Sequence, residues 1–308
     1  MKSLSHYDAD AIVSSVPVST AIAILRTIFQ ECEDLHPRQS ISLGNFDDLL
    51  IMPAVSPIGI GVKIVTVVSD NPSHGLPLIH AHYLFCDPKT GVPLATLDGS
   101  ALTALRTPAV SALATDILAP SEPTTLGVFG TGTQARGHIE AMIEVRPSLE
   151  SVIVYGRTSE KSQDFAAKIE PNGRQIDAGS ADEAAACDIV CGCTSAAEPV
   201  IPTEAVQPGS HLNLVGSYSS SRREIGNDLV NLASVYVDNR EAAMAEAGEL
   251  IHASAGPWSF DQIVGDLGEL VRGEVGRQHT NEITLFKSVG LAIEDVAIAA
   301  AVIKAGGD

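Results

Sequence analysis

The chain has 308 residues, of which 45% are hydrophobic and 4% aromatic, and its formal net charge at pH 7 is -19. This length predicts two domains or one elaborated α/β unit, with a core built mostly from alanine, valine, isoleucine and leucine. The negative charge argues against binding nucleic acid or an anionic membrane through bulk electrostatics. A basic residue among apolar neighbours is therefore a candidate for binding a specific anion.

The five cysteines are odd in number and follow no disulfide framework. The chain opens without a signal peptide, and no apolar run is long enough to span a bilayer, so we expect a cytoplasmic protein with reduced thiols. Cys187, Cys191 and Cys193 lie in CDIVCGCTS, which is typical of a buried strand. Tetrahedral zinc would need a fourth ligand and a different spacing, so we expect core packing here and no metal site.

Residues 1–60 contain a segment whose apolar spacing from Ile22 to Phe29 predicts a helix, followed by a β-prone run. Arg38 lies between Pro37 and this run, at the entrance to a predicted strand. From its residue type, Arg38 is either a solvated arginine or an anion ligand.

The next run, GIGVKIVTVVSDNP, is an apolar strand interrupted by Lys63. Alternation places Lys63 on the same face as Val65 and Val67, while Val62 and Ile64 point the other way. One interpretation is an edge strand with a lysine that extends to solvent. The other is a lysine held in a cleft, where desolvation lowers its pKa and an anion can pair with it.

Residues 76–98 have the pattern of a β-hairpin, with strands from Ile79 to Cys86 and over VPLATL joined by the turn DPKTG. His80 and His82 are two residues apart and therefore share a face of the first strand. A single histidine here would be interpreted as a hydrogen-bonded core residue. Two histidines on one face are also consistent with a cleft that contains solvent.

The segment SALTALRTPAVSALATDILA predicts a helix capped by Ser100 and kinked near Pro108. Arg106 is the only cation on this otherwise apolar helix. Because a buried guanidinium is costly unless it is paired, we expect an anionic partner. This partner is either a carboxylate of the protein or a bound carboxylate or phosphate.

Residues 120–123 break the helical pattern and mark a domain boundary. The stretch TTLGVFGTGTQARGHIEAMI then predicts a strand, a glycine turn and a helix, with Gly130, Gly132 and Ala135 spaced as G-x-G-x-x-A. The first glycine allows the tight turn, and the second lets backbone N–H groups approach a pyrophosphate. The third small residue lets the helix pack on the strand, and the helix dipole favours negative charge. This stretch predicts a dinucleotide site.

The second strand of this domain ends in Gly156-Arg157-Thr158-Ser159, where NAD-specific proteins carry an acidic residue that binds the ribose 2′-hydroxyl. An arginine with hydroxyls suits a 2′-phosphate, so NADP(H) is favoured and NAD(H) is possible. Further strands end at Thr194 and at Gly216-Ser217, and small or hydroxyl residues at strand ends match the ligand crevice of doubly wound sheets. We therefore predict an α/β fold, with a Rossmann domain over residues 120–292. A second, α+β domain is predicted over residues 1–119 and 293–308, because the alanine-rich final helix should pack on the N-terminal segment.

Six stretches in the family's order resemble the ornithine cyclodeaminase/mu-crystallin family of reductases and cyclodeaminases, and the resemblance spans nearly the whole chain. They are LLIMPA (49–54), GVKIV (61–65), LDGSALTALRTPAVSALA (97–114), GVFGTGTQARGHI (127–139), LNLVGSYSSSRRE (212–224) and TLFKSVGLAIED (284–295).

The resemblance implies a homodimer whose first domains join strands across the dimer. It also implies that Arg38, Lys63 and Arg106 surround the substrate carboxylate and the nicotinamide end of the cofactor. Val289 matches a position beside the substrate, and Thr107 matches a cofactor contact. Positions along the dinucleotide are matched by Thr133, Gln134, Arg157, Thr194, Val215, Arg222 and Ser288.

Two departures from the cyclodeaminases bear on the reaction. Cyclodeaminases place a proton-managing aspartate shortly after the strand equivalent to 212–216, where this chain has Tyr218 and no carboxylate before Glu224. Leu78 falls near a threonine that contacts cofactor in the cyclodeaminases. The first departure weakens ornithine cyclodeamination and fits the imine reductases of the family.

The sequence therefore predicts an NAD(P)H-dependent reductase of small cyclic imino acids, most simply of 1-pyrroline-2-carboxylate to L-proline, with the six-membered piperideine analogue also accepted. Lys63 is the expected proton donor, and His80 or His82 is a substitute. The alternatives are an ornithine cyclodeaminase, an alanine or N-alkyl amino acid dehydrogenase, and a non-catalytic NADP-dependent binding protein of the crystallin kind.

Overall fold

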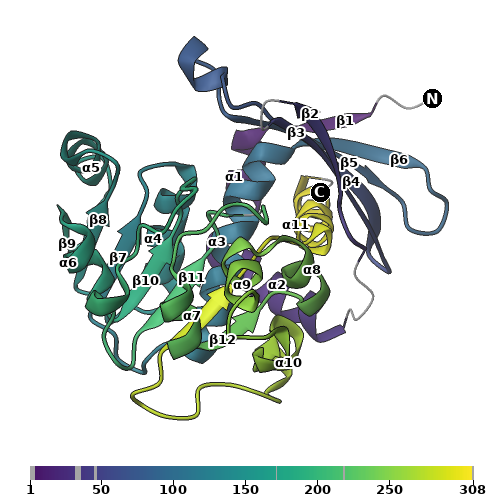
Figure 1. Ribbon diagram of the computed structural model, residues 1–308. Helices are drawn as coiled ribbons and strands as arrows, with labels where there is room; N and C mark the ends of the chain where they lie inside the picture. The colour runs from purple at the N-terminus through teal and green to yellow at the C-terminus, as the bar shows by residue number, and fades with distance from the viewer. Residues whose placement is uncertain (1–3, 32–35, 45–46, 171, 218, 307–308) are drawn as a thin grey trace. The chain divides into compact units, whose positions relative to one another are not determined.

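The computed structural model describes residues 4–31, 36–44, 47–170, 172–217 and 219–306 (Figure 1). The chain forms two compact units, the first made of residues 1–106 and 291–308 and the second of residues 107–290. The boundary between the two units falls between Arg106 and Thr107, inside one long helix. The boundary predicted from the sequence, at residues 120–123, lies after the end of that helix.

Unit 1 contains a six-stranded sheet in the order β1-β6-β5-β4-β3-β2, in which β1 and β6 are parallel and the other pairs antiparallel. The strands are β1 (Ser5–Tyr7), β2 (Gln39–Gly44), β3 (Asp47–Ser56), β4 (Gly59–Val67), β5 (Ile79–Cys86) and β6 (Pro93–Asp98). The helical elements are α1 (Ala9–Ser15), α2 (Val18–Glu31), η1 (Asn71–His74), the first part of α3 (Gly99–Leu118) and α11 (Ala292–Gly306). The predicted hairpin is confirmed by β5 and β6.

The sheet of unit 1 has one buried and one partly exposed face. Along β4 the buried positions alternate from Gly59 to Val67 and include Lys63. Helix α11 packs on this face, because a Cβ at Gly59 would lie 3.2 Å from Val296. On the other face Ile64 is 50% exposed. Since β4 lies between β3 and β5, the interpretation of Lys63 as an edge-strand residue is wrong.

Helix α3 begins one residue earlier than predicted and has a different cap. The Asp98 carboxylate accepts hydrogen bonds from the backbone N–H groups of Ser100 (2.8 Å) and Ala101 (2.9 Å). Asp98, the last residue of β6, therefore caps the helix in place of Ser100.

Unit 2 contains an eight-stranded parallel sheet in the order β13-β12-β14-β11-β10-β7-β8-β9. From β9 to β11 the order β9-β8-β7-β10-β11 reproduces the 3-2-1-4-5 order of the Rossmann fold, and β14, the last strand in the chain, takes the sixth place. The predicted doubly wound sheet is therefore confirmed. The strands are β7 (Thr125–Phe129), β8 (Ser151–Tyr155), β9 (Gln175–Ala178), β10 (Ile189–Gly192), β11 (His211–Leu214), β12 (Ser234–Val237), β13 (Gly265–Asp266) and β14 (Thr284–Lys287). The helical elements are α4 (Thr133–Val145), α5 (Ser159–Ala166), α6 (Ala181–Ala185), η2 (Thr203–Ala205), α7 (Asn227–Leu232), α8 (Arg240–Glu246), α9 (Gly248–Ser254), η3 (Phe260–Gln262) and α10 (Leu267–Arg272).

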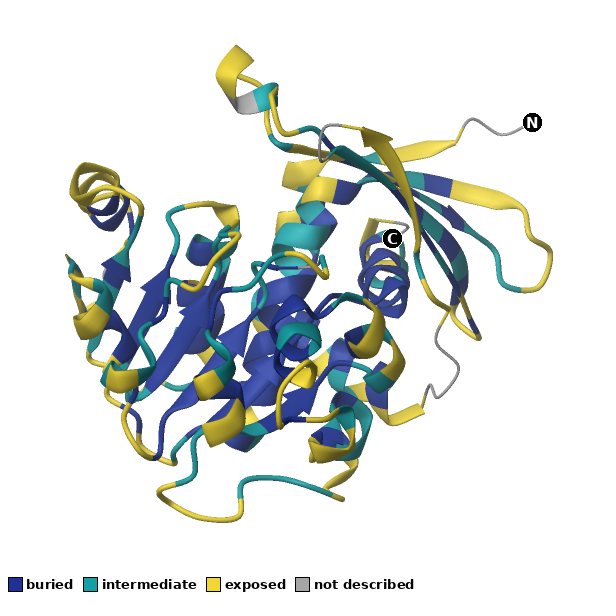
Figure 2. Cartoon of the chain, in the orientation of Figure 1, coloured by how far each residue is buried: buried dark blue, intermediate teal, exposed yellow. Residues whose placement is uncertain are grey.

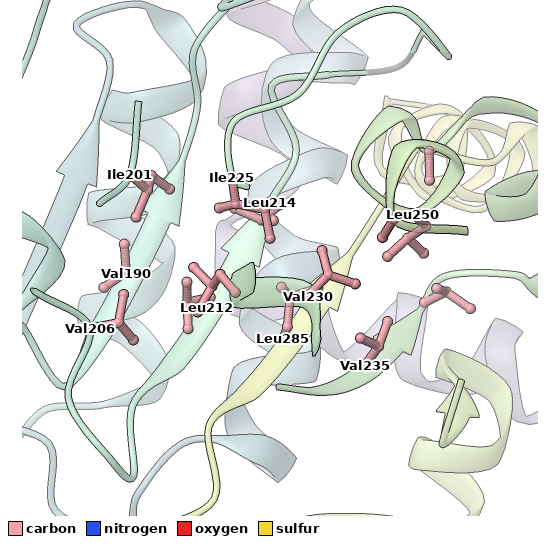
Figure 3. Packing of buried hydrophobic residues seen from close by; sticks show 14 of the residues in the cluster. Val190, Ile201, Val206, Leu212, Leu214, Ile225, Val230, Val235, Leu250 and Leu285 are labelled. Carbon is pink, nitrogen blue, oxygen red and sulfur yellow. The ribbon is translucent and has the colours of Figure 1, made fainter. Parts of the chain in front are cut away.

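The core of unit 2 lies along the middle strands of this sheet, which are buried throughout (Figure 2). Figure 3 shows Leu212, Leu214 and Leu285 on neighbouring strands, with Val230 of α7 and Leu250 of α9 in the same cluster. Aliphatic residues fill this layer, as expected for a chain with few aromatic residues. The core holds the carboxyl ends of the strands in fixed register.

Within the described residues, no single helix is long and apolar enough to cross a membrane. Helices α1 and α2 satisfy the length and composition criteria only together, and the pair is bent by 79° at the break between them.

Candidate cofactor and substrate sites

The glycine turn has the geometry that its spacing predicts. Gly130 has φ +118°, and a Cβ there would lie 2.7 Å from the Cys193 carbonyl oxygen, so only glycine fits. Gly132 is the N-cap residue of α4, and a Cβ on it would meet no described atom within 4 Å. Thr133 and Gln134 form the first turn of the helix behind it. The helix N-terminus therefore opens toward space that a phosphate group could occupy.

A cavity of about 490 Å³ lies at this turn. Its walls are residues 130–132 after β7, 155–157 after β8 and 193–196 after β10, with Lys161 and Val200. These segments follow the carboxyl ends of adjacent strands at the point where the strand order reverses, which is where dinucleotides bind in doubly wound sheets.

The end of β8 is basic. Arg157 and Thr158 are exposed, and the Thr158 hydroxyl caps α5 by accepting from the Lys161 N–H at 3.3 Å. Lys161, one turn into α5, was missed by the sequence analysis although its spacing from Arg157 indicated it. No acidic side chain stands from 155 to 159, and Glu160, between the two cations, does not line the cavity, so Arg157 and Lys161 suit an anionic group on the ribose.

Three predicted cofactor-binding hydroxyls donate to buried carboxylates of the protein. Thr194 donates to Glu224 at 2.8 Å. Ser217 lies 2.9 Å from both carboxylate oxygens of Glu249 and also accepts from Lys287. Ser288 donates to the third carboxylate, Asp238, at 2.9 Å. All three acids are buried, and the sequence analysis assigned none of them a role.

The other predicted dinucleotide positions are held by backbone bonds. Arg222 donates to the Ser195 carbonyl at 2.7 Å, and the Val215 N–H donates to the Gly192 carbonyl at 3.0 Å. Val289, predicted to lie beside the substrate, is buried, and its N–H donates to Asp238 at 2.7 Å. Thr107 is buried, and its hydroxyl has no hydrogen-bond partner among the described residues. Contacts of these residues with a ligand remain predictions.

Unit 1 buries a charged network around Lys63. The Lys63 ammonium lies 2.8 and 2.9 Å from the two carboxylate oxygens of Asp295 and donates to the Thr103 hydroxyl at 3.0 Å. Arg106 donates to Glu294 at 2.8 Å, and its Nε lies 3.6 Å from Asp295. Of the two partners left open for Arg106, the structure shows a protein carboxylate, and adjacent acids of α11 pair with both Arg106 and Lys63.

This network balances two positive charges against two negative charges, all at most 6% exposed. Burial lowers the pKa of Lys63 from its ordinary value to about 8, while the nearby Asp295 carboxylate raises it and Arg106 lowers it. A lysine with such a pKa exchanges protons near neutral pH, as a general acid must.

Arg38 directly precedes β2, next to the line of residues that pair across the sheet with Lys63. It immediately precedes Gln39, which pairs with Ile51, and the next residue of β3, Met52, pairs with Lys63. Arg38 is half-buried. The predicted cations Arg38, Lys63 and Arg106 thus belong to one compact unit.

The two histidines lie on the opposite face of the sheet from Lys63. His82 pairs with Ile64 and His80 with Thr66, on the side where Ile64 is exposed, and both histidines are themselves exposed. His82 lies near His6, with 6.3 Å between ring centroids. Because the sheet separates them from Lys63, the prediction that either histidine substitutes for it as proton donor within this chain is wrong.

A different side chain shares the buried face with the lysine. Tyr83 pairs with Lys63 on the adjoining strand and is 1% exposed. Burial, together with Asp295, raises its pKa well above the ordinary value, so its hydroxyl stays protonated. Tyr218, at the cyclodeaminase aspartate position, lies outside the described residues. Leu78 is half-buried, and its carbonyl accepts from the Val68 N–H.

The cysteines of β10 and its flanks are packed in the interior. Cys187 is 3% exposed and Cys191 is fully buried, and burial raises their pKa values to about 11 and about 12. No group of three or more possible metal-binding side chains is found in the part of the chain that the structure describes.

The model of the ornithine cyclodeaminase/mu-crystallin family matches residues 28–305. The chain belongs to this family. It is 39% identical over 271 residues to a Delta(1)-pyrroline-2-carboxylate reductase of Bacillus cereus, a match that covers 85% of this chain and 83% of the relative.

Two solved structures share the fold over nearly the whole chain. Delta(1)-pyrroline-2-carboxylate reductase of Thermococcus litoralis, in complex with NADH and L-proline, superposes with a TM-score of 0.95 and is 32% identical, covering 98% of this chain and 97% of that one. An archaeal alanine dehydrogenase dimer with bound NAD has a TM-score of 0.93 and 28% identity, with coverage of 98% and 96%. The predicted family membership is confirmed.

Proposed function

We propose that the protein is an NAD(P)H-dependent reductase of small cyclic imino acids, with 1-pyrroline-2-carboxylate as the first candidate substrate and its six-membered analogue as the second. The observation that carries the proposal is a buried lysine with a pKa of about 8, which is paired with Asp295 beside Arg106, in a chain that also has a dinucleotide turn. The 39% identity to a reductase of this name supports it.

The residues of unit 2 fit a nicotinamide dinucleotide. Gly132 leaves room where a phosphate would approach the N-terminus of α4, and the cavity runs from there to the basic end of β8. The residues that would hold the cofactor are the glycine turn, Thr133, Gln134, Arg157 and Lys161. When bound, it supplies a hydride, and the protein contributes orientation and electrostatics.

Lys63 has the task of delivering a proton. Reduction of a C=N bond needs a hydride on carbon and a proton on nitrogen, so that the imine becomes an amine. The ammonium of Lys63 gives up the proton and becomes a neutral amine, and the Asp295 carboxylate at 2.8 Å favours its reprotonation.

Arg38 and Arg106 are the proposed partners of the substrate carboxylate. A guanidinium presents several N–H donors in a planar fork, so Arg106 can bind Glu294 and a second carboxylate at once. The Glu294 pair also keeps this arginine in place beside Lys63.

The reaction is tested with a panel of substrates. Five- and six-membered cyclic imines, pyruvate with ammonia or methylamine, and ornithine are each offered with NADPH and NADH, and cofactor absorbance and ammonia release are followed. We expect oxidation of the reduced cofactor with the cyclic imines. Turnover of pyruvate alone would favour an alanine or N-alkyl amino acid dehydrogenase, which the similarity to alanine dehydrogenase makes the second candidate. Ammonia release from ornithine, or cofactor binding without turnover, would overturn the proposal.

We further propose that NADPH is preferred and NADH accepted. Arg157 and Lys161 line the cavity at the ribose end, and no acid stands from 155 to 159 to repel a 2′-phosphate. The Thermococcus litoralis relative was solved with NADH, which supports acceptance of both cofactors.

Arg157→Asp tests this preference. The change should lower the ratio of kcat/KM for NADPH to that for NADH by about tenfold or more, because it replaces a charge-assisted bond by repulsion. Lys168→Asp makes the same charge change at an exposed position outside the cavity lining and should leave the ratio unchanged. An unaltered ratio in Arg157→Asp would place the ribose elsewhere.

A homodimer is proposed from the partly exposed face of the unit 1 sheet. Ile41, Val55, Ile64 and Leu94, on β2, β3, β4 and β6, are between 41% and 51% exposed. Exposed apolar surface of this kind marks an interaction site. The related archaeal alanine dehydrogenase is a dimer. Light scattering of the purified protein should give twice the mass of one chain, and a monomeric mass would contradict the proposal.

A further inference from the structure

One buried carboxylate joins the ends of two neighbouring strands of unit 2. Glu224 is 0% exposed. One of its carboxylate oxygens accepts from the N–H (2.7 Å) and the hydroxyl (2.8 Å) of Thr194, and the other accepts from the Gly216 N–H (2.9 Å). Thr194 follows β10 by two residues, and Gly216 follows β11 by two residues. Three donors from two loops therefore meet on a single side chain.

The surrounding chain is shaped to hold this carboxylate. A Cβ at Gly192 would lie 2.9 Å from a Glu224 oxygen, and a Cβ at Gly216 would overlap the Thr194 carbonyl. The Glu224 backbone is also anchored, because its carbonyl accepts from the N–H groups of Val200 (2.9 Å) and Ile201 (3.1 Å). The carboxylate thus occupies a defined position between the ends of β10 and β11.

The segments that Glu224 joins belong to the nicotinamide half of the expected crevice. Thr194 and its neighbours Cys193 and Ser195 line the cavity at the glycine turn. In a doubly wound sheet the first half of the strands holds one nucleotide and the second half, here β10, β11 and β14, holds the other. The backbone geometry after β10 therefore sets one wall of the site.

We propose that Glu224 is a positioning residue for the dinucleotide, whose carboxylate form aligns the ends of β10 and β11 so that the nicotinamide half of the crevice binds tightly. The inference rests on the proposed function only in its assignment of the cofactor. An ionised carboxylate accepts all three hydrogen bonds, whereas a protonated one turns an oxygen into a donor that faces an N–H or O–H donor. Protonation should therefore loosen one of the two strand ends.

The charges around Glu224 place this change near neutral pH. Burial raises its pKa to about 7, Lys287 of β14 lowers it, and Glu249 of α9 raises it. The thiols of Cys191 and Cys193 also face it, but burial raises the pKa of the first to about 12 and that of the second well above its ordinary value. Both thiols stay neutral and leave the carboxyl group as the one that titrates. Cofactor affinity should therefore rise as pH increases through about 7.

The test measures the Kd of NADH for the full-length protein by cofactor fluorescence at a series of pH values on either side of neutrality. NADH is the probe because it lacks a 2′-phosphate, whose own titration would obscure that of the protein. The wild type should bind NADH about tenfold more tightly above pH 7 than below it. Glu224→Gln should bind at the weaker level at every pH, because an amide reproduces the protonated acid.

Glu282→Gln is the matched control. The Glu282 carboxylate also accepts two backbone N–H groups, from Gln278 (2.6 Å) and His279 (3.3 Å), but it precedes β14 and so lies at the amino ends of the strands, away from the crevice at their carboxyl ends. This variant should keep the wild-type affinity and pH dependence.

A wild-type Kd that does not change with pH would overturn the inference, and so would wild-type binding in Glu224→Gln. The first measurement needs no variant and can overturn the inference even if Glu224→Gln fails to fold. A wild type that binds NADH with this pH dependence but reduces no imine would overturn the proposed reaction while supporting the role of Glu224. A wild type that binds no dinucleotide would overturn both.

Discussion

The candidate ligand sites of the two units are built from different parts of the chain. In unit 1 the candidate chemistry is carried by side chains, since Lys63 and Arg106 are buried against Asp295 and Glu294. In unit 2 it is carried by the backbone, since the cavity lies against a glycine turn and a helix N-terminus whose amides could approach a phosphate. The buried acids of unit 2 contribute indirectly, through the hydrogen bonds that hold the strand ends.

This difference indicates which changes each unit can tolerate. A side-chain site is lost when a functional group is removed, even if the backbone is unchanged. A backbone site is lost when a single methyl group is added, even if no functional group is removed. Substitutions at Lys63, Gly132 and Asp295 test this contrast.

Removing the amine of Lys63 should have the largest effect. Lys63→Ala should lower kcat with a cyclic imine by about 10²–10⁴-fold, which is the usual contribution of a general acid. Lys63→Arg keeps a positive charge beside Asp295 but cannot release a proton at neutral pH, so its kcat should fall similarly. Both variants should still bind NADH. A rate near that of the wild type in either variant would remove the lysine from the reaction.

Adding a methyl group at Gly132 should weaken cofactor binding without unfolding the protein. Its φ of -102° suits alanine, and the new Cβ would point into open space. The Kd of NADPH, measured by calorimetry, should rise about 10–100-fold because the phosphate is displaced. Gly127→Ala is the structural contrast, because its Cβ would overlap the Ala184 carbonyl of α6 and lower the thermal stability. Unchanged NADPH binding in Gly132→Ala would refute the placement of the pyrophosphate.

Neutralising Asp295 should move the pH dependence rather than abolish the reaction. The protonated form of Lys63 is the proposed donor, so wild-type kcat should fall as pH rises through about 8. Asp295 raises the pKa of Lys63, and therefore Asp295→Asn should shift this fall to lower pH. The pH–rate profile measures the shift, and thermal unfolding checks the fold because a buried ion pair has been broken. An unmoved profile would show that Asp295 does not control Lys63.

The parts of the structure that the sequence predicted well depend on short stretches of chain. The turn at Gly130 and Gly132 is confirmed because strand, turn and helix are contiguous. The face of Lys63 was also predicted correctly, because alternation along a single strand fixes it. The identity of the family came from six short stretches that occur together in the family's order, since any one of them alone could be accidental.

The parts that were missed depend on contacts between distant segments. Asp295 lies 232 residues after Lys63, and nothing in either stretch alone pairs them. Adjacent acids in the apolar run AIEDVAIAAA were a usable signal, because buried carboxylates require cations. His80 and His82 were misplaced because alternation does not say which face of β5 meets the core. The aromatic residues Tyr83 and Phe85, on the other face, indicated it.

The burial of the Lys63 network has a consequence for the effect of ionic strength. A cyclic imino acid that enters with an unprotonated nitrogen brings one negative charge, its carboxylate, to this network, and because the network is buried, dissolved salt would screen that charge little. A dinucleotide instead brings several negative charges to Arg157 and Lys161, both exposed on a strongly acidic protein. Added salt should therefore alter the KM of the cofactor and leave the KM of the imine nearly constant.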